Sequence, residues 1–152
     1  MKISGNYTLN TTPDIFWKMV MNPVVLEKVT PGIKELKEKG QDTYHALSAI
    51  KVGPVKGEFA GELAIKNKVE NQRCVLVVDQ KSKMGNVVAE ISMKIDEELA
   101  GTTKIYYTGE ARMSGMLARM GQRIMSGVVS TLSKQFFHAM ETQLEEQQQA
   151  KT

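Results

Sequence analysis

The chain has 152 residues and a net charge of +3, and 41% of its residues are hydrophobic, which is typical of one globular domain with a single core. The small charge and the scarcity of aromatic residues do not favour nucleic-acid binding, which relies on basic surfaces and stacking platforms. The sequence has neither a signal-peptide core nor an apolar run of roughly 20 residues, so a cytoplasmic protein is expected, with any membrane contact made peripherally at the inner face.

The N-terminal part is predicted to form one strand and two short helices. Residues 2–10 alternate between apolar and polar side chains, which indicates a half-buried strand. The segment TTPDIFWKMV opens with a capping threonine, a proline and an acidic residue, as the first turn of a helix often does. Asn22-Pro23 ends this helix and opens a second one, which Thr30-Pro31-Gly32 ends in turn.

The middle of the chain is predicted to consist of strands joined by short turns. Six segments have this pattern: residues 33–40, 42–52, 55–70, 73–83, 87–98 and 102–113. Long strands with short connections favour an antiparallel meander. Cys74 lies in the run RCVLVV and is expected to be a buried strand residue, since no histidine or basic helix end lies beside it in sequence.

After Gly115 the hydrophobic period changes from two to 3.6 residues, which predicts one long amphipathic helix. Its apolar stripe consists of Leu117, Gly121, Ile124, Val128, Leu132 and Ala139, flanked by Met120, Met125 and Phe136. Such a helix packs into the concave face of a curved antiparallel sheet.

The predicted fold is therefore α+β, of the helix-grip type. A seven-stranded curved antiparallel sheet wraps around the long C-terminal helix, and two short helices follow the first strand. The single domain is expected to span residues 1–145, with a frayed polar tail over residues 146–152.

Small residues on the inner faces of two strands suggest a cavity between sheet and helix. Gly57 and Gly61 share a face with Phe59, and Gly109 and Ala111 share one with neighbouring apolar residues. Methionine lines such a space flexibly. Alternatively, these glycines only let the sheet bend, and the methionines fill the gap. The residues predicted to line a ligand cavity are Tyr7, Trp17, Phe59, Gly61, Tyr107, Met113, Leu117, Met120, Gly121, Ile124, Met125 and Val128.

Within this set, three aromatic residues carry polar groups. Tyr7 and Tyr107 are the polar handles of the predicted cavity, and each either hydrogen-bonds within the core or orients a ligand. Trp17 either contacts a ligand at the cavity mouth or simply packs its helix on the sheet. The sequence contains no nucleophile elbow, P-loop or dinucleotide fingerprint. Neither His45 nor His138 has a cysteine or histidine at metal-ligand spacing. No catalytic residue and no metal ligand is therefore predicted.

The outer face of the predicted long helix is basic. Arg119, Arg123 and Lys134 lie opposite the apolar stripe, and Met116 and Phe137 project outward on an ideal helical wheel. A basic face with exposed apolar residues favours docking to an anionic membrane or an acidic partner. The alternative is an ordinary solvated helix face.

Three segments resemble the CoxG family of carbon monoxide dehydrogenase subunits. They are NPVVLEKVTPGIKEL, the hairpin IKVGPVKGEFAGELAI and the helix GMLARMGQRIMSGVVSTLSKQFF, and the resemblance covers residues 1–140. It implies a START/Bet v 1-like helix-grip fold and places Leu26 and Pro31 at the cavity mouth. The sequence departs from the family at VVDQKSKMGNVVAE, where members are often Gly- and Ala-rich, and it lacks the long C-terminal extension of some members. A soluble shuttle is therefore expected rather than an anchored protein.

The resemblance also implies a function. Family members resemble carriers of hydrophobic ligands and serve carbon monoxide dehydrogenase-type molybdenum hydroxylases, which they link to the membrane. No cofactor is required, but a bound quinone, lipid or fatty acid is expected. Two alternatives stay open at this point: an enzyme of the polyketide cyclase or aromatase type, and a ligand-free assembly factor for an oxidoreductase.

Overall fold

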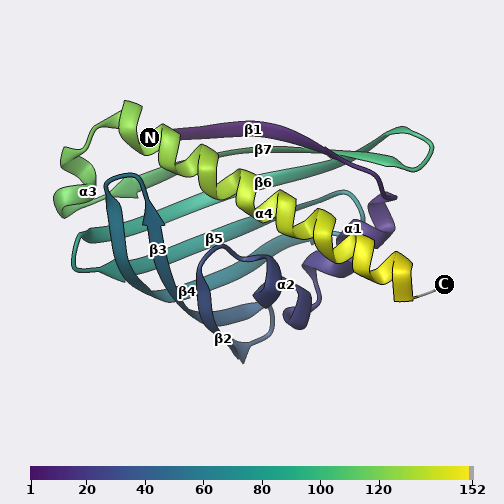
Figure 1. The fold of residues 1–152 in the computed structure, drawn as a ribbon, viewed down its shortest axis with the longest axis horizontal. Coiled ribbons are helices and arrows are strands. Elements are labelled where there is room, and N and C mark those ends of the chain that lie inside the picture. Colours follow the sequence, from purple (N-terminus) through teal and green to yellow (C-terminus); the bar gives the residue numbers. More distant parts are fainter. Residues whose placement is uncertain (151–152) are drawn as a thin grey trace.

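The computed structural model describes residues 1–150 and has the predicted order of strands and short helices (Figure 1). A first strand, β1 (Lys2–Leu9), is followed by the helices α1 (Pro13–Val20) and α2 (Pro23–Val29). The remaining strands are β2 (Ile33–Gly40), β3 (Thr43–Val52), β4 (Val55–Val69), β5 (Arg73–Ser82), β6 (Gly85–Leu99) and β7 (Thr102–Met113). Helices α3 (Gly115–Arg119) and α4 (Gln122–Ala150) complete the chain.

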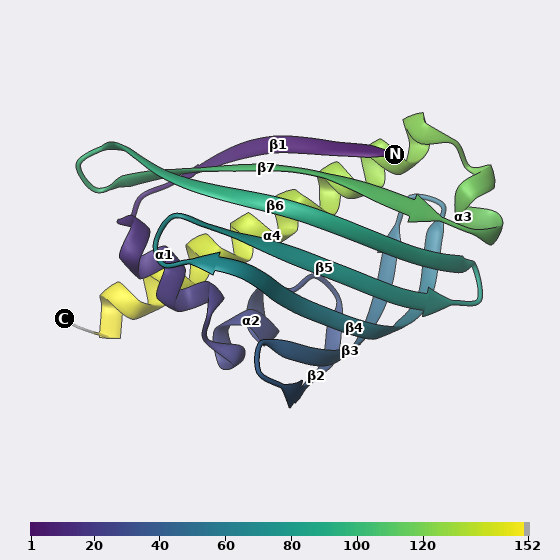
Figure 2. The ribbon, with the colours of Figure 1, turned by 180° about the vertical axis from the view of Figure 1, so that it is seen from behind.

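The strands form one antiparallel sheet in the order β1-β7-β6-β5-β4-β3-β2. Each strand after β2 pairs with the strand before it, and β1 pairs with β7 at the far edge, with Lys2 opposite Glu110. Helix α4 crosses one face of this curved sheet, and the view from behind places the sheet in front of it (Figures 1 and 2). The seven-stranded helix-grip fold predicted from the sequence is therefore confirmed.

Helices α1 and α2 cover one end of the sheet, and their first turns are well specified by the sequence. Asn22 accepts a hydrogen bond from the backbone N–H of Val24 at 3.0 Å, which caps α2. Thr12 precedes α1 in an extended conformation, but its hydroxyl donates to the Asp14 carboxylate rather than capping the helix backbone. These short helices bury Phe16 and Val29 almost completely.

The core is divided between the two ends of α4. At one end, residues of α1 and α2 pack with Phe137, Met140 and Leu144 of α4. At the other end, a smaller cluster joins the β3–β4 hairpin to α3 and the start of α4, through Val55, Phe59, Leu117, Met125 and Val128. A third cluster, formed by Ile3, Ala89 and Ala111, lies on β1, β6 and β7. This division leaves the middle of the concave face less tightly filled.

The prediction of a single helix from Gly115 onward is wrong. Gly115 and Gly121 have φ values of +62° and +85°, so both adopt the left-handed backbone conformation that favours glycine. They flank the segment that contains α3, and α4 begins only at Gln122. Of the glycines in this region, Gly115 and Gly121 therefore mark breaks in the chain direction, and Gly127 lies inside a helix.

The predicted polar tail is helical over most of its length. Helix α4 continues through Ala150, and its last residues are exposed. Residues 151–152, the end of the predicted tail, lie outside the described residues.

Candidate ligand cavity

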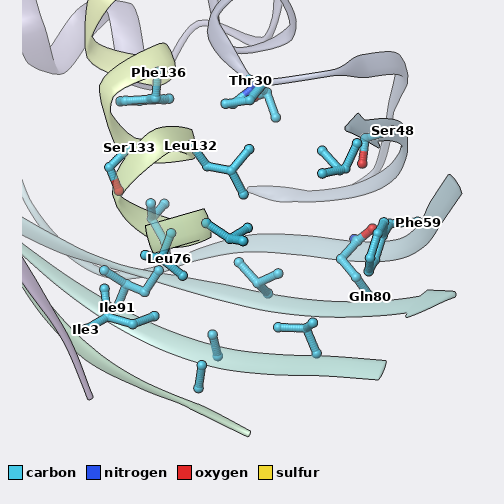
Figure 3. Close-up of a pocket in the computed structure, with 18 of the residues that line it drawn as sticks. Ile3, Thr30, Ser48, Phe59, Leu76, Gln80, Ile91, Leu132, Ser133 and Phe136 are labelled. Carbon is cyan, nitrogen blue, oxygen red and sulfur yellow. The ribbon is translucent and has the colours of Figure 1, made fainter. Parts of the chain in front are cut away.

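A cavity of about 350 Å³ lies between the concave face of the sheet and α4 (Figure 3). Its wall is almost entirely apolar, and its volume is within the range of roughly 300–1,000 Å³ that is usual for ligand pockets. All seven strands contribute to the wall, and α3 and α4 close the opposite side. The residues on the sheet side with mainly apolar side chains are Met1, Ile3, Ile33, Ala46, Ile50, Val55, Phe59, Leu63, Leu76, Val78, Val87, Ala89, Ile91, Met93, Tyr107, Ala111 and Met113.

The cavity stays open because small side chains lie on the sheet beneath the helix. Ala46, Ala89 and Ala111 all face the cavity and are almost fully covered by their own neighbours. Larger neighbours such as Leu76 and Ile91 are only partly buried, although they lie beneath α4. Apolar surface that faces an internal space instead of other side chains is available to an apolar ligand.

The helical wall comes mainly from one side of α4. Met125, Val128, Val129, Leu132, Ser133 and Phe136 line the cavity, and Leu117 of α3 joins them. Figure 3 shows Leu132 reaching inward from the helix. Leu132 and Phe136 fall on or beside the apolar stripe of the predicted helix, but the sequence did not predict either as a ligand contact.

Half of the residues predicted to line the cavity lie in its wall. These are Pro31, Phe59, Tyr107, Met113, Leu117, Met125 and Val128. The other half do not. Trp17 and Leu26 are 8% and 3% exposed and belong to the core beneath α1 and α2, so the packing interpretation of Trp17 is the one that the geometry supports.

The helix break explains three of these errors. Met120 and Gly121 form the break itself, and Ile124 is 44% exposed on the outside of α4. A continuous helix from Gly115 would have carried the stripe of Leu117 onto Ile124. The break changes the helical phase, so the inward stripe starts at Met125 instead.

Tyr7 and Phe137 meet each other at one end of the cavity. Their rings are stacked, with centroids 4.8 Å apart, and Tyr107 stacks on the same Phe137 ring at 5.9 Å. Phe137 is 3% exposed, so its predicted place on an outer docking face is wrong, because this part of α4 packs in the core cluster that includes residues of α1 and α2. Tyr7 supports Phe137 from β1 and is not itself part of the cavity wall.

The Tyr7 hydroxyl donates a hydrogen bond to the carboxylate of Glu141, one turn beyond Phe137 on α4. This hydrogen bond, together with burial, raises the pKa of Tyr7. The tyrosine is therefore a neutral hydrogen-bond donor that ties α4 to β1.

Few polar side chains lie in the cavity wall: Thr30, Ser48, Gln80 and Ser133 (Figure 3). Thr30 donates its hydroxyl hydrogen to the carbonyl oxygen of Leu26 at 2.6 Å. The Nε2 group of Gln80 donates to the carbonyl oxygen of Glu62 at 3.3 Å, whereas its Oε1 atom has no partner among the described residues. Sequence reasoning missed Gln80, although the alternation of Cys74, Leu76 and Val78 continues onto it and could have placed it on the inner face.

Gly61 lies directly opposite Gln80 in the β4–β5 register. A Cβ atom at this position would lie 2.0 Å from the carbonyl oxygen of Asp79 on the neighbouring strand. Gly61 is therefore required by close backbone approach, and it is absent from the cavity wall that was predicted for it.

Cys74 is buried at 2% exposure, as predicted from its place in an apolar strand. Burial raises the pKa of its thiol to about 11, because the charged thiolate is poorly solvated there, and the positive charge of Lys68 only partly offsets this effect. Among residues 1–150, no three His, Cys, Asp or Glu side chains are grouped so that they could hold a metal ion. Within the same range, none of the helices has the length and apolar character needed to cross a membrane.

The predicted docking residues other than Phe137 lie on the surface. Arg119, Arg123 and Lys134 are exposed, and Met116 is 54% exposed in α3. Ile124, which was expected inside, adds a second exposed apolar side chain to this part of the chain. We refer to Met116, Arg119, Arg123 and Ile124 as the basic apolar patch.

The family model for CoxG, a carbon monoxide dehydrogenase subunit, matches residues 5–145. The chain belongs to this family. Its sequence matches no protein with curated function. The match confirms the family resemblance that the three short segments carried, and it covers most of the chain.

Solved structures of other proteins share this fold. A conserved protein from Geobacillus kaustophilus is 27% identical, with a TM-score of 0.93 and 96% of each chain covered. A START superfamily protein from Mycobacterium smegmatis is 12% identical, with a TM-score of 0.72 over 95% of this chain and 97% of that one. The Zhui aromatase/cyclase from Streptomyces sp. R1128 is also 12% identical, with a TM-score of 0.68 and coverage of 95% and 93%. At these lower identities, the likeness is one of fold alone.

Proposed function

We propose that this CoxG protein is a non-catalytic carrier of a quinone- or lipid-like molecule. It serves a carbon monoxide dehydrogenase-type molybdenum hydroxylase and links that enzyme to the membrane. The cavity beneath α4 is the single observation that carries the proposal. Membership of the CoxG family supports the accessory role and suggests the kind of partner.

The chemistry of the wall favours an apolar ligand. An apolar molecule placed there removes its own surface and that of partly buried residues such as Leu63, Val78 and Ile91 from water. Burial of apolar surface contributes about 25 cal/mol per Å². A cavity of about 350 Å³ accommodates a ring or a short chain, so only part of a long isoprenoid or acyl tail would lie inside.

The basic apolar patch gives the carrier a way to meet a membrane surface. Arg119 and Arg123 attract anionic headgroups, and Met116 and Ile124 can insert between them. Leu117, in the same short helix as Met116 and Arg119, lines the cavity. Docking through this patch would therefore bring the bilayer next to one end of the ligand site.

Ligand binding is tested first by native mass spectrometry of the purified protein, followed by organic extraction and identification of bound molecules. We expect a stoichiometric quinone, lipid or fatty acid, or uptake of one when it is added to the apo protein. An apo mass with no uptake would contradict the carrier proposal and favour the ligand-free assembly factor.

A matched pair of variants tests whether the ligand binds in the cavity. Val129→Trp fills the space from α4, because Val129 lines the cavity and is only partly buried. Val88→Trp makes the same addition at a site on β6 that is 49% exposed. We expect uptake to be lost in Val129→Trp and retained in Val88→Trp. Equal uptake by both would mean that the ligand binds elsewhere.

The partner is tested separately, by analytical ultracentrifugation with a purified carbon monoxide dehydrogenase-type molybdenum hydroxylase from the same organism. Co-sedimentation supports the accessory role, and its absence at high concentrations of both proteins contradicts it. Conversion of an added polyketide substrate by the isolated protein would instead support a cyclase-type enzyme, and loss of that conversion in Tyr107→Phe would locate it in the cavity.

A further inference from the structure

The cavity wall has one polar corner, formed by side chains on three adjacent strands (Figure 3). Ser48 of β3 lies directly opposite Phe59 of β4. Gln80 of β5 lies opposite Gly61, two residues further along β4, and is therefore the diagonal neighbour of Phe59. The amide of Gln80 and the hydroxyl of Ser48 thus flank one aromatic ring in a wall that is otherwise mainly apolar.

The orientation of the Gln80 amide is set by its hydrogen bond. A backbone carbonyl oxygen only accepts hydrogen bonds, so the amide nitrogen must be the atom that faces the carbonyl oxygen of Glu62 at 3.3 Å. The Oε1 atom is then the other end of the amide, and it is an acceptor. The Oε1 atom can therefore be satisfied only by a hydrogen-bond donor.

The part of the chain that the structure describes supplies no such donor. Gln80 is 9% exposed, and its Oε1 atom has no hydrogen-bond partner among residues 1–150. A buried carbonyl without a partner destabilises the protein, and an apolar side chain in its place would avoid that cost. Leu76 and Val78 precede Gln80 on the inner face of β5, and both are apolar. The packing of this face therefore does not require an amide at position 80.

The fold also makes room for this side chain. Gly61, opposite Gln80 on β4, has no side chain, and Val87 is the partner of Gln80 on β6. The amide therefore reaches the Glu62 carbonyl on β4 without displacing a neighbour. The backbones of β4 and β5 approach closely at Gly61, and Gln80 opposite it uses only its amide nitrogen in a hydrogen bond. Its Oε1 atom is therefore left as an acceptor in a mainly apolar cavity.

We infer that the ligand of this cavity carries a hydroxyl-type hydrogen-bond donor, which it presents to Oε1 of Gln80. The inference rests on the proposed function and narrows its ligand class to alcohols, phenols, quinols and protonated carboxylic acids. The Ser48 hydroxyl can donate to the oxygen of the same group. A quinone, ether or ester has acceptors only and leaves Oε1 unpaired, so a carrier of quinones would prefer the reduced quinol.

The test compares two ligands of similar shape, 1-decanol and 1-methoxydecane. Their Kd values are measured by displacement of the fluorescent probe N-phenyl-1-naphthylamine from the full-length wild-type protein and from Gln80→Leu. The ratio of the ether Kd to the alcohol Kd is compared between the two proteins, because the different hydration of the ligands cancels. We expect this ratio to fall about tenfold in Gln80→Leu, as the loss of one buried hydrogen bond implies.

Two further variants make the comparison robust. Gln80→Met, which is unbranched and of similar length, replaces Gln80→Leu if the branched side chain impairs folding. Val78→Ala is the matched control, because Val78 lies two residues before Gln80 in β5 and lines the same wall. It should weaken both ligands alike and leave the ratio unchanged.

The outcomes separate this inference from the function on which it rests. One outcome is that both ligands bind the wild type while the ratio of their Kd values in Gln80→Leu and in Gln80→Met stays equal to the wild-type ratio. In that case the cavity binds apolar molecules and the role of Gln80 is refuted. An internal water bound to Oε1 would give this result. If the wild type binds neither ligand nor the probe, the proposed function fails and the inference fails with it.

Discussion

The ring of Phe137 lies flat against the ring of Tyr7, with centroids 4.8 Å apart and planes inclined by only 6°. Phe137 is on α4 and Tyr7 is on β1, so this stack joins the last element of the chain to the first. The Tyr7 hydroxyl also donates to Glu141, one helical turn further on. The rotation of α4 about its own axis is thereby fixed, and with it the residues that face the cavity.

Phe137→Ala should be among the most destabilising substitutions in α4. It removes a nearly buried ring that contacts three other aromatic rings, and Phe-to-Ala changes in cores cost about 3–5 kcal/mol. Urea denaturation measures the loss. His138→Ala, at the exposed neighbouring position, is the control and should change the free energy of unfolding by less than about 0.5 kcal/mol. Equal effects would mean that the aromatic stack does not hold the helix.

Gly121→Ala and Gly127→Ala should have opposite effects on stability. Gly121 has a φ of +85°, and a left-handed conformation costs a residue with a side chain about 1–2 kcal/mol. Gly127 lies inside α4, and a Cβ atom added there would meet no atom within 4 Å beyond the helix's own backbone. Alanine should therefore stabilise the helix by about 1 kcal/mol. Thermal and urea denaturation measure the change in the free energy of unfolding for each of the two variants. Stabilisation by Gly121→Ala would show that α3 and α4 fuse into one helix without cost.

Cys74 should react slowly with thiol reagents in the folded protein. Its pKa of about 11 leaves on the order of one thiol in a thousand ionised at pH 8, and the side chain is buried. We expect the reaction with Ellman's reagent to be at least about 100-fold slower in buffer than in denaturing urea. Equally fast labelling in both conditions would indicate that β5 opens readily.

The raised pKa of the Cys74 thiol should also make the free energy of unfolding depend on pH in the alkaline range. Its pKa is raised in the folded state, so the unfolded chain loses its proton first as the pH rises. The contribution of the protonated Cys74 thiol to the free energy of unfolding is fully present below the ordinary pKa of about 9, and it is lost progressively up to pH 11. Cys74→Ala should therefore reduce the fall in unfolding free energy between pH 9 and 11. An identical fall in wild type and variant would assign it to other groups.

The basic apolar patch should bind anionic membranes. The double variant Arg119→Glu, Arg123→Glu is expected to abolish co-sedimentation with vesicles that contain phosphatidylglycerol, without lowering the melting temperature, because both side chains are exposed. Lys66→Glu with Lys81→Glu makes the same change in net charge at exposed sites on β4 and β5. This control should still bind vesicles. Loss of binding in both would point to net charge, and unchanged binding in the first would exclude the patch.

The strands were predictable because their signal is local. Alternation over residues 2–10 and the glycine, proline and asparagine turns mark each strand, since period two and tight turns depend on neighbouring residues only. All seven described strands consequently begin and end within two residues of their predicted limits. The helix-grip fold follows from that order, because a long amphipathic helix after a meander has one concave face to cover.

The cavity wall was harder to predict, because it depends on phase and register. After the break at the left-handed Gly121, Ile124 is exposed and Met125 is buried. Phe137 lies in the core, and not on the predicted surface, because residues of α1 and α2 pack in the same cluster. Periodicity alone cannot detect such a break, since both phases give an amphipathic wheel. Gln80 was overlooked because a polar residue in a strand normally faces solvent.

Local patterns and motifs in chain order were enough to predict the antiparallel sheet, the buried Cys74 and the family. They were not enough to predict which side chains share the cavity. That outcome depends on the pairing of Ser48 with Phe59, on the pairing of Gly61 with Gln80, and on the rotation of α4 about its axis. These contacts join residues far apart in the chain, and packing selects among arrangements that the local patterns leave equivalent.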